Sequence, residues 1–446
     1  MKTKSLFLCI VVLFVTASCN QDPIFYTIST EPALKEAYIK GTPSNMVVFE
    51  REYHLDEPPQ IIKVPILYVG SERLNWYAKR NYGRNTPQGQ DPGSSWNNAD
   101  YRIPQPGERI IQLAATENYL YALWSTRTGS NRTISRIGSD DDEWTRIDPS
   151  GYPLQTIYSD PVSGRLFAGA GVGSSNNSVI LYLYEDDSDS DPDNHVLEFR
   201  LLKSATAVLS GTAFVGGSHY LSTRGSGIFR VEESVLDSGV TINESHVHHL
   251  DFWLEPGSSK KDHLFMGMIR LEDSNNTIIA IERNGGTLYK VDTLNDLYEQ
   301  IEYTDHESNK TTVATGRFAT GALALWENPG DSSKKLLVAG RQGSLVHSTA
   351  SSIPNGYVEF DLDDNDSLKI VGITETDLAR YEYPRLKSVD HNDRYIATIG
   401  PVPINHLLQA PEEVSVKRTF FASTQNEGLW SYRDVSGVPQ WNAETN

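Results

Sequence analysis

The chain has 446 residues, and its 39 lysines and arginines against 58 aspartates and glutamates give a formal net charge of −19. This acidic balance excludes a dedicated nucleic-acid binder, because phosphate contacts need clustered basic side chains. Hydrophobic residues make up 38% of the chain and aromatic residues 10%, which excludes a wholly disordered protein. We therefore expect a folded protein with no nucleic-acid partner.

The first segment has the pattern of an export signal. Lys2 and Lys4 precede an apolar run at residues 6–17, which is too short to cross a bilayer core of about 30 Å. Small residues then lead to Cys19, and this ending resembles the bacterial lipobox, in which the cysteine is lipidated, with palmitate among the acyl chains, and becomes the new N-terminus. Thr16 stands where the lipobox usually has leucine, so signal cleavage with an unmodified Cys19 is the alternative.

This pattern divides the chain into three parts. Residues 1–18 form the signal peptide, residues 19–44 form the lipidated cysteine and a polar tether, and residues 45–446 form one domain. Cys9 would leave with the signal, so the mature chain would have no partner for a disulfide at Cys19. We expect an exported protein held by a lipid in the cell envelope, at the outer membrane, on its periplasmic or its surface face.

Short β-rich runs separated by turn residues repeat along the expected domain. Each repeat has a β-run that ends in small residues, a polar or glycine turn, and a second β-run. The first runs are residues 67–70, 120–123, 166–169, 220–223, 278–281, 336–340 and 420–423. The strands expected before them are residues 45–49, 110–115, 154–158, 206–215, 264–269, 321–326 and 394–399. Outer strands are expected at residues 143–147, 196–201, 357–362 and 438–442, and insertions at 72–95, 363–386 and 401–417.

Four strands in each of seven repeats predict an all-β fold. It is a β-propeller of seven blades with four antiparallel strands each, and six or eight blades are the alternatives. The ring either closes without strand exchange or takes residues 24–28 as an added strand of its last blade.

An acidic stretch has the spacing of a calcium loop. Asp187, Asp189, Asp191, Asp193 and Glu198 match the acidic ligand positions of a twelve-residue loop. Pro192 stands where that loop needs glycine for its sharp turn, and this favours a solvated hairpin tip. Calcium is the one cofactor that the sequence suggests, and we otherwise expect none.

Two further groups of residues were weighed as sites. His246, His248 and His249 are close in sequence, but no second histidine pair or metal-binding motif completes them. Aromatic residues surround the first insertion, which makes them candidate ligand contacts, because insertions of repeat proteins often form the binding face. These residues are Trp76, Tyr77, Tyr82 and Trp96. No nucleophile elbow or phosphate loop is present, which favours a protein that is not an enzyme.

Both ends of the chain carry a family resemblance. Residues 19–29, with Cys19 first, and residues 41–49 resemble the N-terminus of uncharacterised spirochaete lipoproteins, and residues 420–432 are similar to propeller repeats of that group. The resemblance implies an envelope location and a propeller body.

Three functions remain open from sequence. The leading hypothesis is a lipid-anchored module that binds or scaffolds a protein or glycan ligand. The alternatives are an extracytoplasmic hydrolase or lyase acting on a polysaccharide or lactone in the propeller channel, and an outer-membrane assembly scaffold.

Overall fold

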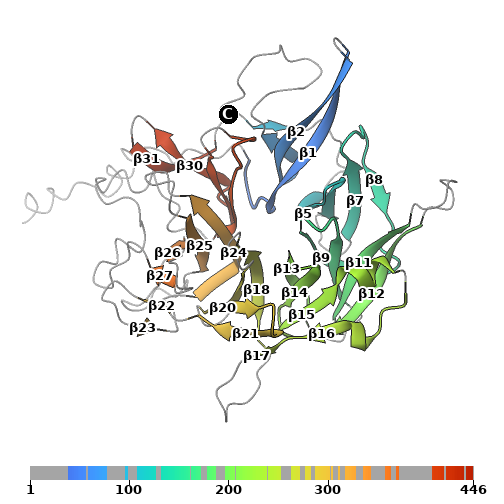
Figure 1. The fold of residues 1–446 in the computed structure, drawn as a ribbon. Helices are drawn as coiled ribbons and strands as arrows, with labels where there is room; N and C mark the ends of the chain where they lie inside the picture. Colours follow the sequence, from blue (N-terminus) through green and yellow to red (C-terminus); the bar gives the residue numbers. More distant parts are fainter. Residues whose placement is uncertain are drawn as a thin grey trace, which may run out of the picture.

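The chain folds into seven antiparallel sheets arranged as a ring (Figure 1). The structure is a computed structural model. It describes residues 39–56, 59–77, 96–98, 108–126, 132–160, 162–171, 178–186, 196–205, 207–238, 240–252, 263–271, 277–282, 287–301, 303–304, 310–311, 317–327, 335–342, 357–362, 368–370, 404–415, 418–435 and 438–444.

The sheets are numbered as blades I to VII in chain order, and in each the strands follow one another as a meander. Blade I has β1 (Met46–Asp56), β2 (Pro59–Gly70), β3 (Leu74–Tyr77) and β4 (Asn97–Asn98). Blade II has β5 (Arg109–Ala115), β6 (Tyr119–Ser125), β7 (Arg132–Gly138) and β8 (Thr145–Ile147). Blade III has β9 (Leu154–Ser159), β10 (Leu166–Gly171), β11 (Ser178–Asp186) and β12 (Val196–Ala205). Blade IV has β13 (Leu209–Val215), β14 (Ser218–Thr223), β15 (Ile228–Glu232) and β16 (Val247–His249).

The remaining blades repeat this plan with small additions. Blade V has β18 (Phe265–Arg270), β19 (Ile278–Glu282), β20 (Leu288–Asp292) and β21 (Leu297–Gln300), with β17 (Asp251–Phe252) added parallel to β21. Blade VI has β24 (Arg317–Glu327), β25 (Lys335–Gln342), β26 (Tyr357–Leu362) and β27 (Leu368–Ile370), with β22 (Tyr303–Thr304) and β23 (Lys310–Thr311) beyond β27. Blade VII has β28 (Ile404–Gln409), β29 (Phe420–Thr424), β30 (Leu429–Val435) and β31 (Val438–Ala443).

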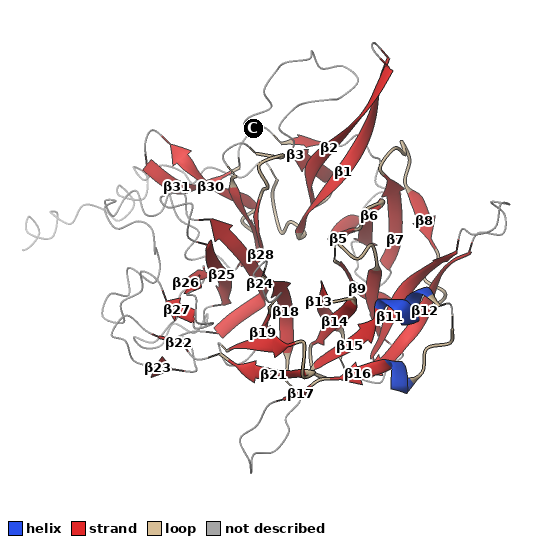
Figure 2. Ribbon diagram, in the orientation of Figure 1, coloured by secondary structure: helices blue, strands red, loops and turns tan. Residues whose placement is uncertain are grey.

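Figure 2 shows that strands dominate the described chain, with helix only beside blades III and IV. These are α3 (Glu233–Asp237) and the 3-10 turn η2 (Glu244–His246), both between β15 and β16. Among the residues described, no helix is long and apolar enough to cross a membrane.

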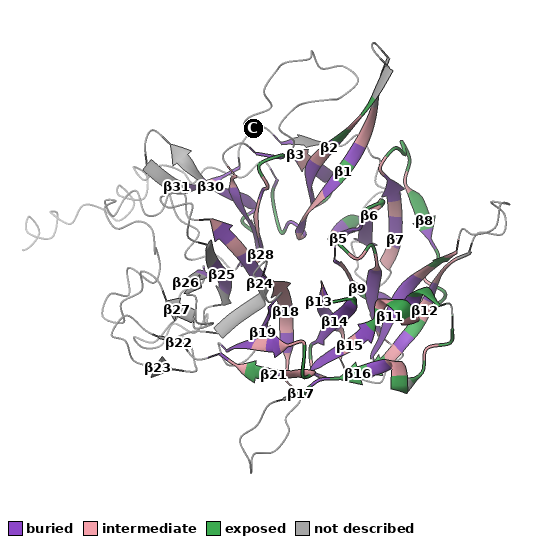
Figure 3. Ribbon diagram, viewed as in Figure 1, coloured by how far each residue is buried: buried purple, intermediate pink, exposed green. Residues whose placement is uncertain are grey.

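In blades II and IV burial falls from the second strand toward the outer strand (Figure 3). All six residues of β14 are buried, whereas two of the three residues of β8 and of β16 are exposed. The second strand of a blade is covered on both faces by the neighbouring blades, so it has the continuous apolar sequence of a buried strand. The outer strand is covered less, which explains its more polar sequence.

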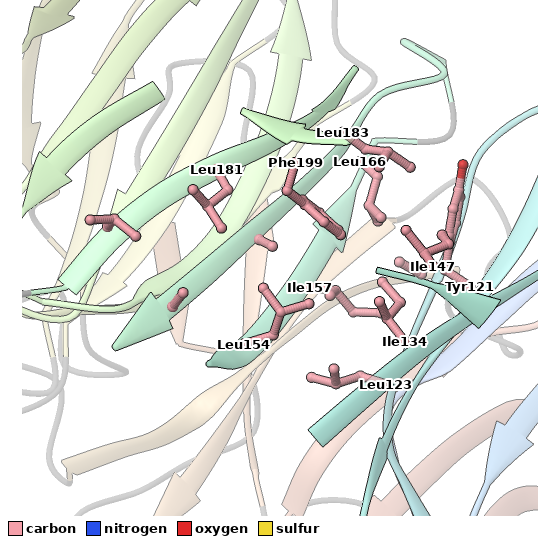
Figure 4. Packing of buried hydrophobic residues seen from close by; sticks show 14 residues of the cluster. Tyr121, Leu123, Ile134, Ile147, Leu154, Ile157, Leu166, Leu181, Leu183 and Phe199 are labelled. Atoms are coloured by element: carbon pink, nitrogen blue, oxygen red, sulfur yellow. The ribbon is translucent and has the colours of Figure 1, made fainter. Parts of the chain in front are cut away.

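The core consists of seven clusters, one between each pair of adjacent blades. Blades II and III meet through an aliphatic cluster that includes Leu123, Ile157 and Phe199 (Figure 4). Blades VI and VII meet through aromatic rings, where Trp326 stacks on Phe420 with 4.6 Å between ring centroids. Seven interfaces among seven sheets require a closed ring.

The small residues that end the second strands have a packing role. A Cβ built on Gly70 would lie 2.3 Å from Cγ2 of Ile110 in the next blade, and one on Gly169 would lie 2.9 Å from the backbone nitrogen of Leu209. At both positions a neighbouring inner strand passes too closely for a side chain. The repeat signature in the sequence therefore comes from contacts between blades.

Blades I and VII close the ring without exchanging a strand in the described residues. All four strands of blade VII come from the C-terminal part of the chain, and Figure 1 shows them beside blade I. The segment before β1 forms an isolated parallel bridge, Gly41 with Glu427, and packs buried Ile39 into the cluster between blades I and VII. Leu429 N donates to Ile39 O at 3.1 Å, Gly428 N to Gly41 O at 2.9 Å, and the Ser423 hydroxyl to Pro43 O at 2.8 Å. The expected strand at residues 24–28 lies outside the described residues.

The seven-bladed all-β propeller is confirmed, and two strand assignments need correction. The inner strand of blade VII is β28, in a stretch expected to be an insertion, whereas residues 394–399 lie outside the described residues. Residues 357–362, expected as an outer strand, form β26, the third strand of blade VI, and the outermost member of its meander is β27.

Candidate functional site: the central channel

A cavity of about 880 Å³ lies along the axis of the ring, and residues from all seven inner strands line it. These strands are β1, β5, β9, β13, β18, β24 and β28 (Figure 2). Neighbouring inner strands contact one another around the whole ring, including β28 with β1. The channel is therefore a continuous feature of the closed propeller.

Each inner strand is a sheet edge, so its outward N–H and C=O groups need partners from elsewhere. The structure supplies several of them from side chains on or beside the neighbouring inner strand. The Asn45 side chain pairs with both backbone groups of Leu113, at 2.7 Å for each bond. Gln112 Oε1 accepts from Ile157 N at 3.0 Å. This bracing satisfies the edges and fixes each blade against its neighbour.

The same contacts show that the inner strands begin at one end of the channel. Ile110 N, at the start of β5, donates to Ser71 O beside the end of β2 at 2.9 Å. The Thr156 hydroxyl near the start of β9 donates to Leu209 O at the start of β13 at 2.9 Å. The end where the strands begin is called the N-terminal mouth below, and the end where they finish the C-terminal mouth.

The C-terminal mouth is closely braced by paired polar groups. Asp160 is buried and accepts from Phe214 N at 2.8 Å, while Arg270 donates to Phe214 O at 3.1 Å. Gln409 Oε1 accepts from Glu327 N at 2.9 Å, and Arg418 pairs with the Glu327 carboxylate. Every charged group in this set has a partner, so its chemistry is used within the fold.

Behind this mouth, between blades III and IV, lies a buried polar cluster. His219 is fully buried between the rings of Phe167 and Phe214 and contacts the Glu233 carboxylate. Arg165 pairs with Glu233 at 2.7 Å. Burial works to raise the pKa of Glu233, but hydrogen bonds from His219 and Arg165 dominate and lower it.

The N-terminal mouth holds arginines that pair with no carboxylate of the described part of the chain. Arg109 opens β5 and Arg224 follows β14; both are exposed and both line the cavity. Arg109, Ser125 and Arg132 are register partners across β5, β6 and β7, so the two arginines lie on one face of blade II. Burial lowers the pKa of Arg132, and the charges of Arg109 and Arg224 lower it further. The charges of Arg109 and Arg224 thus act on the guanidinium group of Arg132.

Two further polar groups lie deeper in the channel. Burial raises the pKa of Tyr158, and the nearby side chains of Arg224 and Gln112 offset part of that rise. Burial lowers the pKa of His406 to about 4. Met46 N donates to its Nδ1 at 3.2 Å, so the neutral ring carries its proton on Nε2. Tyr158 and His406 are both uncharged near neutral pH.

The remaining wall is largely apolar. Six lining residues with apolar side chains are half-buried, which leaves part of each side chain open to the cavity. They are Val47, Val48, Ile111, Met266, Met268 and Leu408. No aspartate or glutamate of the described residues lines the cavity. The channel therefore offers positive charge at one mouth, neutral hydrogen-bonding groups and apolar surface.

Most residues of the predicted calcium loop lie outside the described residues, as does Cys19. Asp187, Asp189, Asp191 and Asp193 belong to this group, and Glu198 lies in β12. The Glu198 carboxylate accepts from Arg200 Nε at 2.7 Å, and Arg200 in turn lies over the ring of Tyr184. Among the residues that the structure does describe, no cluster of His, Cys, Asp or Glu has metal-site geometry. Calcium binding stays a prediction.

The predicted aromatic patch is distributed between packing and surface. Tyr77 and Trp96 are buried with Phe421 between blades I and VII, where ring centroids lie 5.5 to 5.7 Å apart. Trp96 Nε1 also donates to Glu444 Oε2 at 2.9 Å. Trp76 is half-buried, and Tyr82 lies outside the described residues. Burial gives Tyr77 and Trp96 a role in ring closure, and a ligand contact in this patch stays a prediction.

The three histidines do not converge. His246 belongs to the capping box of η2, His248 is exposed, and His249 bonds Ser226 O at 2.9 Å through Nε2. Sequence reasoning missed the channel arginines, because they are far apart in the chain. The available signal was their shared position beside the N-terminal ends of inner strands.

Fold and channel together define a closed seven-bladed β-propeller with a cavity large enough for a small organic ligand. No protein-family model matches the chain, and no curated protein matches it.

Several solved structures are similar over nearly the whole chain. The virginiamycin B lyase from Staphylococcus aureus is 8% identical, with a TM-score of 0.47 over 92% of this chain and 97% of that one. YCF48 bound to a D1 peptide is 13% identical, with a TM-score of 0.45 over 91% and 96%. The GH74 xyloglucanase from Xanthomonas campestris is 10% identical, with a TM-score of 0.42 over 92% and 56%. These likenesses are too weak to carry an argument about activity, and the fold assignment rests on the seven sheets themselves.

Proposed function

We propose that this chain is a lipid-anchored protein of the bacterial cell envelope whose propeller binds a ligand in its central channel. The main observation that supports ligand binding is the cavity of about 880 Å³, which all seven inner strands line. A pocket of this size with apolar walls and a few placed polar groups is typical of small-molecule sites.

The charges of the lining favour binding over hydrolysis. Glycoside hydrolysis requires a pair of carboxyl groups, and none of the described lining residues carries one. Two other titratable groups of the lining, Tyr158 and His406, are half-buried and neutral near pH 7. A binding module therefore fits the described lining better than a glycoside hydrolase.

The anchor half of the proposal rests on the N-terminal sequence. Residues 1–18 have the export pattern, and Cys19 follows the small residues of a lipobox-like ending. The first described residue, Ile39, is bound at blade VII, so residues 19–38 would connect the lipid to the ring at that blade.

Two measurements test the two halves. Wild type should incorporate labelled palmitate in a bacterial host and fractionate with membranes, whereas Cys19→Ser should lose the label. A label that persists in Cys19→Ser would overturn the anchor. For the channel, the folded wild-type protein should bind an amphipathic fluorescent probe, anilinonaphthalene sulfonate, at one saturable site. Absence of saturable binding would overturn the channel as a ligand site.

A further inference from the structure

The N-terminal mouth combines features that select one class of ligand. This inference rests on the proposed channel function and names the chemistry of the ligand. We propose that the channel binds an amphipathic organic anion, with its oxyanion head at Arg109 and Arg224 and its apolar body along the channel wall.

Arginines of the chain differ in their partners. Arg136, Arg165, Arg200, Arg230 and Arg418 each pair with a carboxylate. Among the residues that the structure describes, no carboxylate pairs with Arg109 or Arg224, although the chain has 58 acidic residues and a formal net charge of −19. An acidic protein that gathers arginines without neutralising them leaves a positive site for an external anion.

The second argument is geometric. Register across blade II sets Arg109 and Arg132 on one face, and Arg132 bonds the backbone oxygen of Gln155 in blade III. This bond fixes Arg132 near the other two cations. The repulsion of Arg132 by Arg109 and Arg224 is relieved when an oxyanion enters between them, and planar guanidinium groups bind carboxylate or phosphate oxygens in pairs.

The third argument is the wall below the arginines. Six half-buried apolar residues line the cavity, among them Met266 and Met268 of β18. Methionine side chains adapt to irregular apolar ligands. A small inorganic anion would contact the arginines of the N-terminal mouth but leave the apolar wall in contact with water. An anion with an apolar body would contact both the arginines and the wall, so the observations favour the amphipathic ligand.

The experiment measures binding of anilinonaphthalene sulfonate, which joins an anionic head to an apolar body, by fluorescence titration of the folded protein. The test variant is Arg109→Gln/Arg224→Gln. The matched control is Lys63→Gln/Arg146→Gln, which removes two exposed charges outside the channel lining. Competitors are dodecanoate, dodecyl phosphate, dodecanol and inorganic phosphate. Circular dichroism verifies that each variant is folded.

The test variant should bind the probe at least about tenfold more weakly, since two charge-assisted contacts are lost, and the control should match wild type. Dodecanoate and dodecyl phosphate should displace the probe, and the tighter of the two identifies the preferred head group. Equal affinity of the test variant and wild type would overturn the anion site while leaving the channel function intact. Displacement by inorganic phosphate or by dodecanol as strong as that by the alkyl anions would overturn the amphipathic assignment. A second variant, Met266→Gln/Met268→Gln, should weaken alkyl anions without changing their preference over dodecanol.

Discussion

The polar side chains at the two mouths of the channel have different partners. At the C-terminal mouth Asp160, Arg270 and Gln409 satisfy backbone groups of neighbouring inner strands. At the N-terminal mouth no carboxylate of the described residues pairs with Arg109 or Arg224. The side chains of the C-terminal mouth stabilise the fold, and the arginines of the N-terminal mouth are available to bind a ligand. Substitutions at the C-terminal mouth should therefore cost stability, and those at the N-terminal mouth should cost binding.

The largest loss of stability is expected from Asp160→Ala. The substitution leaves Phe214 N and Val162 N without their carboxylate acceptors. We expect the free energy of unfolding to fall by about 3 kcal/mol, because one buried carboxylate serves two backbone donors. Urea denaturation measures it. Asp140→Ala, which removes an exposed carboxylate, should change stability by less than about 0.5 kcal/mol. Equal effects of the two variants would contradict a structural role for the C-terminal mouth.

His406 should make the free energy of unfolding depend on pH. Its pKa is about 4 in the folded chain against 6.5 ordinarily, so below pH 6.5 the unfolded chain takes up the proton first. Stability is therefore fully present above about pH 6.5 and falls as the pH is lowered toward 4, by about 2 kcal/mol between pH 6.5 and 5.

Denaturation midpoints across this pH range test the assignment. His406→Asn should flatten the slope, whereas exposed His248→Asn should leave it as in wild type. An unchanged slope in His406→Asn would assign the acid sensitivity to other groups.

Substitution of Gln112 should lower the free energy of unfolding less, because its side chain accepts a hydrogen bond from one backbone N–H of the neighbouring inner strand. Gln112→Ala leaves Ile157 N without its acceptor and should cost about 1 kcal/mol. Gln112→Glu keeps an acceptor oxygen and should retain more of the stability. Denaturation of both variants compares them, and an alanine variant at least as stable as the glutamate variant would remove the bracing role.

Arg132→Gln should change the free energy of unfolding least, and it should raise that free energy where the other substitutions lower it. Arg109 and Arg224 disfavour the charge on Arg132, so removing that charge relieves repulsion. The free energy of unfolding should stay level or rise by about 0.5 kcal/mol at low ionic strength, and salt should reduce the gain. A loss above about 1 kcal/mol would show that the backbone bond to Gln155 outweighs the repulsion.

Much of this ring could be predicted from sequence, since its repeat signature comes from contacts between blades. The prediction was wrong for the inner strand of blade VII, where the strand preference of the local sequence did not identify the strand that lines the channel. Residues 394–399 contain Tyr395, Ile396, Thr398 and Ile399, which favour a strand, whereas β28 contains Asn405, His406 and Gln409. His406 and Gln409 accept hydrogen bonds from backbone N–H groups of the neighbouring strands β1 and β24.

The candidate site was harder to predict, because only ring closure brings its residues together. Arg109, Arg132 and Arg224 come from three strands or turns of two blades, and none belongs to a local motif. Their meaning depends on which side chains line the cavity, and no Asp or Glu of the described residues does so, a property of space and not of sequence. Tyr77 and Trp96 show the converse, because an insertion predicted as a binding face contributes two rings to the core.

The division between the two mouths is tested most directly by measuring stability and binding on one variant, Arg109→Gln/Arg224→Gln. Urea denaturation and calorimetric titration with dodecyl phosphate give both quantities on the same preparation. The account predicts a free energy of unfolding equal to or above that of wild type, together with a loss of at least about tenfold in affinity. A variant that is destabilised by about 2 kcal/mol or more and still binds dodecyl phosphate like wild type would contradict it.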